Sequence, residues 1–173
     1  SARYTAELAN GFGNLASRTV AMVARYFDSE IPQANEYQPA DKQVQEVAAQ
    51  AVSGAEAAMD RVAIHEAIAS TWKLVDELNN YITTQEPWVL AKDESTRERL
   101  GTVLYTSIEG LRVLAVLLAP VMPKACEKLW AAIGSSLGEL SNQSISEAGV
   151  WGQLAAGTKI SELEALFPRV EEK

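Results

Sequence analysis

The chain has 173 residues, of which 47% are hydrophobic and 22% charged, a balance typical of a globular domain long enough to bury a core. Its net charge of −8 argues against a general nucleic-acid binder, because such proteins bind phosphates through an excess of Lys and Arg. A single cysteine, Cys126, and a single histidine, His65, exclude an internal disulfide framework and the usual structural zinc site.

We expect Cys126 to be a buried, inert thiol, because apolar helix positions flank it, and His65 to be an ordinary surface or boundary residue. The lack of disulfides fits a reducing compartment, and we expect a cytoplasmic protein. No apolar run reaches the length of a membrane span and no signal-peptide pattern opens the chain, so we expect no membrane contact.

Apolar positions near the amino end step by four and three residues, which predicts an α-helix over residues 4–27. The same spacing gathers Asn10, Asn14 and Arg18 on a second, polar face. Gly11 and Gly13 interrupt this helix at about 1 kcal/mol each relative to Ala, and they therefore indicate a partner packed close to the backbone. The first 26 residues hold three Arg and one Glu, so a local contact with RNA is compatible with an acidic chain.

The next part of the chain predicts two further helices. Residues 29–40 hold two prolines and several polar residues and are predicted to form a connector. Asp41 is the predicted N-cap of the second helix, and Gly54 marks a predicted bend. The third helix is predicted over about 59–84, with apolar positions from Val62 onward spaced for burial.

Prolines delimit the remaining helices. Pro87 stops the third helix, and a tryptophan follows it immediately. Ser95 or Thr96 is the predicted cap of a fourth helix that ends at Pro120. Pro123 stands where a first-turn proline is favoured and opens a fifth helix.

The sequence thus predicts an all-α bundle of about five helices over residues 1–134. Residues 135–173 are rich in Ser and Gly at first, with isolated apolar anchors. We expect them to form an irregular C-terminal tail that packs on the bundle or toward a neighbouring domain.

The motifs of common enzyme classes are absent from the sequence. It contains no P-loop, nucleophile elbow or dinucleotide fingerprint. His65-Glu66 begins like the helix of a zinc protease, but position 69 is Ala, so the second histidine is missing. The chain is therefore predicted to carry no catalytic residues.

A binding site is suggested by Trp88, because the preceding proline holds its ring where it can stand exposed. An exposed ring could stack on an unpaired base while amide and guanidinium groups read base edges. The alternative is that Trp88 caps the bundle core. Asn14 and Arg18 likewise fit a ligand contact, a solvated helix face or a buried pair that satisfies its own hydrogen bonds.

The motifs also resemble those of a known family. Leu8–Thr19, with its Gly13-Asn14-Leu15-x-x-Arg18 pattern, resembles the first helix of the anticodon-binding domain of methionyl-tRNA synthetases. Asn79-x-Tyr81-Ile82 followed by Pro87-Trp88-x-Leu90-Ala91-Lys92 is similar to the second signature of that domain. Later landmarks match at 117–123 and at Leu166-Phe167-Pro168-Arg169, so the resemblance covers nearly the whole chain.

The resemblance implies a site that contacts the CAU anticodon of the methionine tRNA. Trp88 would stack on the first anticodon base, a cytosine, on a platform shaped by Pro87. Asn14 and Arg18 would hydrogen-bond anticodon bases or their backbone.

Three further residues are expected to support this site. Asn10 lies on the same polar face as Asn14. Asn79 is expected to lock its helix to the Pro-Trp turn rather than to contact RNA. Tyr81 would help to build the wall behind the turn.

The resemblance further implies a class I aminoacyl-tRNA synthetase that joins methionine to its tRNA with ATP. The catalytic signatures of that family are absent, so we expect this chain to be the C-terminal domain of a larger enzyme. ATP, Mg and methionine would then bind the missing catalytic domain and not this chain. The expected partners are the anticodon loop and that catalytic domain, on which the tail could also pack. The alternative function is a helical protein–protein interaction domain.

Overall fold

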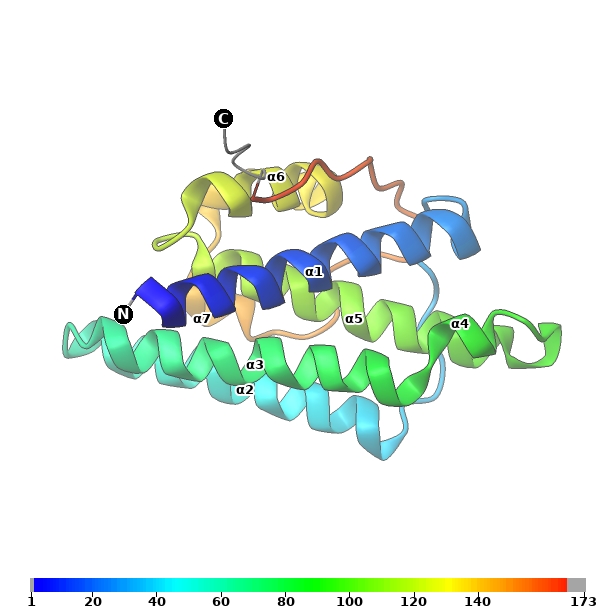
Figure 1. The fold of residues 1–173 in the computed structure, drawn as a ribbon, viewed down its shortest axis with the longest axis horizontal. Helices are drawn as coiled ribbons and strands as arrows, with labels where there is room; N and C mark the ends of the chain where they lie inside the picture. The colour runs from blue at the N-terminus through cyan, green and yellow to red at the C-terminus, as the bar shows by residue number, and fades with distance from the viewer. Residues whose placement is uncertain (1, 168–173) are drawn as a thin grey trace.

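A computed structural model describes residues 2–167, apart from the side chains of residues 2–5 and 64. The helices follow in the order α1 (Ala2–Phe27), α2 (Pro39–Asp60), α3 (Ile64–Gln85), α4 (Pro87–Leu90), α5 (Arg97–Leu118), α6 (Pro123–Ile133) and α7 (Ile145–Ala148), with 3-10 turns η1 (Glu94–Thr96), η2 (Ser135–Leu137) and η3 (Leu140–Asn142). The expected all-α bundle is confirmed (Figure 1). The family landmark at Pro168-Arg169 lies outside the described residues.

Helix α5 forms the centre of the bundle. Every residue from Leu100 to Leu118 is buried, because other helices and the C-terminal segment cover it on all sides. By length and composition alone, Glu94–Leu118 could cross a membrane, but its apolar window is entirely buried inside the bundle. Its hydrophobicity is therefore that of a core helix.

Helices α1 and α3 run in the same direction, and α2 and α5 run in the opposite one (Figure 1). The expected close approach at the α1 glycines is confirmed. A Cβ atom at Gly11 would lie 3.3 Å from Cγ1 of Val75 on α3, and one at Gly13 would lie 3.3 Å from the ring of Phe167. Both glycines thus let another segment approach the backbone of α1.

The boundary between the second and third helices differs from the prediction. Helix α2 continues through Gly54 to Asp60, and α3 begins only at Ile64. The helix therefore does not break at Gly54. A Cβ atom there would clash with the Ser70 side chain on α3, so the glycine allows α2 and α3 to pack closely. Val62 lies in the turn between the helices with φ of +54° and is 81% exposed, so its predicted burial is wrong.

The segment after α6 lies along the bundle and shares its core. Leu154, Ile160 and Leu166 are buried in the same apolar cluster as the helices. The backbone of residues 157–160 also pairs with residues 29–31, where the Ile31 N–H donates to the Thr158 carbonyl at 2.9 Å. Residues 135–167 therefore contact the bundle itself.

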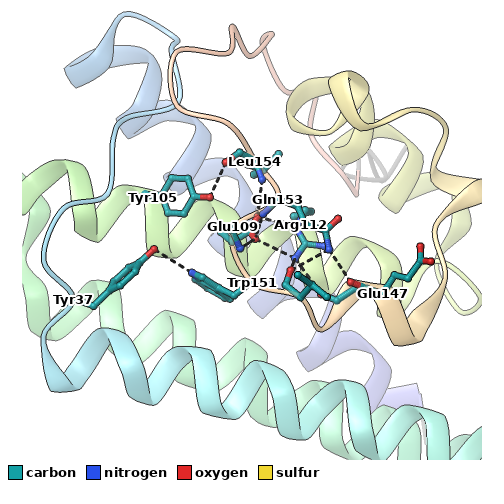
Figure 2. Close-up of polar contacts among 11 residues, drawn as sticks. Tyr37, Tyr105, Glu109, Arg112, Glu147, Trp151, Gln153 and Leu154 are labelled. Carbon is teal, nitrogen blue, oxygen red and sulfur yellow. Dashed lines mark hydrogen bonds and ion pairs between the residues drawn. The ribbon is translucent and has the colours of Figure 1, made fainter.

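A buried ion pair on α5 holds part of this segment (Figure 2). Arg112 Nε donates to Glu109 Oε1 at 2.7 Å, and both side chains are at most 1% exposed. The Glu109 carboxylate also accepts hydrogen bonds from the backbone N–H groups of residues 152–154. Arg112 Nη2 donates to the carbonyls of Ala148 and Val150 at 3.0 and 3.1 Å. The pair thus provides the donors and acceptors for a loop with little regular structure.

Candidate nucleic-acid interface

The chain changes direction sharply where α3 ends. Glu86 adopts the left-handed conformation, with φ of +50° and ψ of 60°, and its N–H still donates to the Ile82 carbonyl at 3.1 Å. A left-handed backbone costs a residue other than Gly about 1–2 kcal/mol. Pro87 is buried and opens α4 directly afterwards. Trp88 is therefore presented by a rigid break between two helices.

The Trp88 side chain is 40% exposed and is not part of the buried core. Its neighbours Leu90 and Ala91 pack against the core and anchor the short helix. Thr96 Oγ1 donates to the Leu90 carbonyl at 2.6 Å, which closes the turn after α4. The ring is thus not buried within the core and stands partly exposed at the surface.

Asn14 and Arg18 are both exposed on α1, as is Asn10. Gly11, Asn14 and Arg18 follow the spacing of three and four residues that keeps side chains on one stripe of a helix. Because Gly11 faces Val75 on α3, this stripe points toward the α3 side of the bundle. Asn14 and Arg18 are exposed although Gly11, less than one turn and about two turns earlier, is covered, so α1 leaves α3 beyond Gly11. Figure 1 shows this divergence of the two helices.

Arg18 and the end of α3 lie at similar heights along the bundle. Asn79 Nδ2 donates to the Gly11 carbonyl at 3.2 Å, which fixes where the parallel helices touch. Gly11 also lies against Val75, one turn before Asn79. Arg18, seven residues or about 10 Å after Gly11 along the helix axis, therefore lies level with the last turn of α3, between Ile82 and Glu86. The Arg97 guanidinium also lies 4.5 Å over the Phe27 ring, which links the end of α1 to the segment after α4. In the described part of the chain no hydrogen bond joins Asn14, Arg18 and Trp88 to one another.

Asn79 and Tyr81 make contacts that differ from those expected. Asn79 locks α3 to α1 through the Gly11 carbonyl, and not α3 to the Pro-Trp turn. Tyr81 is buried and donates its hydroxyl to Asp41 on α2, so it supports the bundle from inside and forms no wall at the surface. Both residues thus fix how the helices pack against one another.

Sequence reasoning missed the polar network beneath this end of α3. Arg99 on α5 donates to both carboxylate oxygens of Asp41, at 2.6 and 2.9 Å, and to Gln85 Oε1 at 2.7 Å. The predicted N-cap role of Asp41 is wrong, because Gln38 occupies that position and its N–H donates to Asp41 Oδ2 at 2.8 Å. The spacing of the two residues, with Pro39 between them, is that of a capping box and could have indicated this.

The network shifts the ionisation of its members. Burial by itself raises the pKa of Asp41, but the hydrogen bonds from Arg99, Tyr81 and the Gln38 N–H outweigh it, and the pKa falls below its usual value. Burial, reinforced by the Asp41 carboxylate, raises the pKa of Tyr81. Asp41 is thus charged and Tyr81 neutral at pH 7.

Asp41→Asn is expected to lower the free energy of unfolding at pH 7 by about 1–3 kcal/mol, because Arg99 loses its charged acceptor. A lowered pKa stabilises the fold fully above the unfolded pKa of about 3.9, and this contribution disappears as the pH falls. The difference in the free energy of unfolding between the variant and the unsubstituted chain should therefore narrow as the pH falls below about 5. Urea unfolding, monitored by circular dichroism at each pH, measures the free energy of unfolding of both proteins. The exposed Asp60→Asn serves as control, and a difference that is constant with pH would contradict the assignment.

Comparison with known proteins points to one family. The model of the anticodon binding domain of methionyl tRNA ligase matches residues 31–173. The chain is 44% identical to the methionine–tRNA ligase of Streptomyces coelicolor over 178 aligned residues, which cover 100% of this chain and 33% of that protein. It is 39% identical to the enzyme of Caldanaerobacter subterraneus, covering 98% of this chain and 26% of that protein. The chain thus spans about a third or less of the length of these relatives.

Solved structures agree with these matches. The apo methionyl-tRNA synthetase of Mycobacterium tuberculosis superposes with a TM-score of 0.87 and 32% identity, covering 99% of this chain and 34% of that one. The same enzyme in complex with methionyl-adenylate gives a TM-score of 0.86, covering 97% of this chain and 32% of that one.

Proposed function

Because the chain belongs to the family of anticodon-binding domains of methionyl-tRNA ligases, we propose that it binds the CAU anticodon of the methionine tRNA. The observation that carries this proposal is the exposed indole of Trp88, held on a rigid turn at the level of Arg18. A protein that recognises single-stranded RNA stacks unpaired bases on such a ring.

In this proposal the first anticodon base, a cytosine, leaves the loop and stacks on Trp88. Stacking alone tolerates any base, because each base has a π-face. Discrimination therefore comes from hydrogen bonds to base edges, for which Asn14 and Arg18 offer an amide and a guanidinium one turn apart. Pro87 and the Asn79 contact with Gly11 keep the two halves of the site in place.

The net charge of −8 fits a larger enzyme in which this chain recognises the anticodon and other parts supply most of the affinity for tRNA. Few phosphates can be neutralised by this chain, so most of the sequence-independent affinity for tRNA would come from elsewhere. We assign to the parent the joining of methionine to its tRNA with ATP. ATP, Mg²⁺ and methionine would bind the remainder of the parent.

Titration of this chain with an RNA stem-loop tests the proposal. A stem-loop with the anticodon CAU should bind more tightly than one altered only at the first anticodon base, at low salt where electrostatic contacts are strongest. Equal binding of both, or no binding of either, would favour a helical domain that contacts other proteins.

Arg18→Lys is expected to lower kcat/KM for tRNA charging by the full-length parent about tenfold, because Lys replaces a planar, forked donor with a point charge. Arg61→Lys, at an exposed position in the turn after α2, is the matched control and should leave charging unchanged. Steady-state aminoacylation with limiting tRNA measures both. Normal charging by the Arg18 variant would remove this residue from the site.

A further inference from the structure

An apolar groove lies at the end of the bundle where α2 turns into α3 and α5 turns into α6. It encloses about 260 Å³, and none of the residues found to line it, among those whose side chains the structure describes, is charged. Its walls are formed mainly by Met59, Val62, Ile68, Leu117, Val121 and Ile145.

Three of these side chains are unusually exposed for their type. Val62 is 81% exposed, Met59 51% and Val121 42%. Val62 is also held at φ of +54°, a conformation that β-branched residues rarely adopt. Scattered exposed apolar side chains need no explanation, but a contiguous apolar groove marks a surface that another segment covers.

The position of the groove identifies that segment. Because α1 and α3 are parallel and touch at Gly11 and Val75, the first turns of α1 lie at the level of the first turns of α3, where Ile68 lines the groove. Figure 1 places the amino end of α1 and the turn between α2 and α3 at the same end of the bundle, with α4 at the other end. A segment that precedes α1 in a longer polypeptide would therefore emerge beside the groove.

We propose that this groove is the docking site for the preceding, catalytic part of the parent polypeptide, which inserts apolar side chains into it. The inference rests on the proposed function. This chain spans only 33% and 26% of the two curated relatives compared above, so most of such a parent lies outside it. Interfaces between permanent partners are more apolar than transient ones, so an apolar groove fits a partner that stays in place. Docking here leaves the Trp88 end exposed to RNA.

Cysteine labelling tests the docking in this chain and in the full-length parent. Val62→Cys reports on the groove, Val121→Cys on its opposite wall, and Val89→Cys, 46% exposed on α4, is the matched control. The native Cys126 gives little background, because it is buried and burial raises the pKa of its thiol to about 12. Alkylation at positions 62 and 121 should be at least tenfold slower in the parent than in this chain, and alkylation at position 89 should be equal in both.

Equal rates at position 62 in the two proteins would overturn the inference. So would protection that already occurs in this chain and increases with its concentration, because a second copy would then fill the groove. The readout needs no RNA. Loss of CAU discrimination with position 62 still protected would contradict the proposed function alone. CAU discrimination with position 62 unprotected would contradict only the docking site.

Discussion

Trp88→Ala is expected to lower kcat/KM for tRNA methionylation by the full-length parent about 5- to 150-fold, which corresponds to the 1–3 kcal/mol of one base stacked on an aromatic ring. The ring is 40% exposed, so its removal deletes a contact surface without opening a cavity in the core. Activation of methionine by ATP should be unchanged, because no tRNA takes part in that step. Aminoacylation and pyrophosphate exchange, measured on the same preparation, separate the two effects.

Two variants on the same short helix control this result. Trp88→Phe keeps an aromatic face on which a base can stack and should recover most of the lost rate. Val89→Ala truncates the similarly exposed neighbour and should have no effect on charging. Normal charging by the Trp88→Ala variant would show that Trp88 is not part of the site, and only the family membership would stand.

Much of the candidate site could be predicted, because it depends on local patterns. The helical spacing of Asn14 and Arg18 and the proline before Trp88 act within a few residues of one another. What joins the two halves could not be predicted. The bond from Asn79 to the Gly11 carbonyl depends on how far two helices have slid past each other, and hydrophobic periodicity carries no information on that register.

The fold, too, could be predicted only in part. The buried stripes and proline boundaries predicted five helices, and each was found. The turn at 61–63 was missed because α2 and α3 have no proline or glycine between them, and Val62 continued the apolar pattern. The network around Asp41 was missed for another reason: a carboxylate near the start of a helix is most often a cap at the surface. Its burial depends on Arg99, which is 58 residues away in sequence.

The buried pair on α5 is the feature furthest from what the sequence indicated. Charged residues three apart on a helix are usually a weak surface pair, yet Glu109 and Arg112 are at most 1% exposed. Arg112→Met should therefore lower the free energy of unfolding by about 3–5 kcal/mol, because it leaves the Glu109 carboxylate buried without its counter-ion. It also removes the donor to the carbonyls of Ala148 and Val150. Urea unfolding measures the loss, and limited proteolysis near residue 150 should detect release of the segment.

A double-mutant cycle separates the cost of the uncompensated Glu109 charge from the other causes of this loss. Glu109→Gln keeps an acceptor for the backbone N–H groups of residues 152–154 but removes the buried negative charge. Arg112→Met should therefore cost clearly less when Glu109→Gln is already present, because no uncompensated charge remains. Arg61→Met breaks an ion pair with Glu66 that is more than half exposed, and should change stability by less than about 1 kcal/mol. If the two α5 substitutions were simply additive, the pair would not act as a unit, and the ordering of the segment would have to depend on its apolar anchors Leu154 and Ile160.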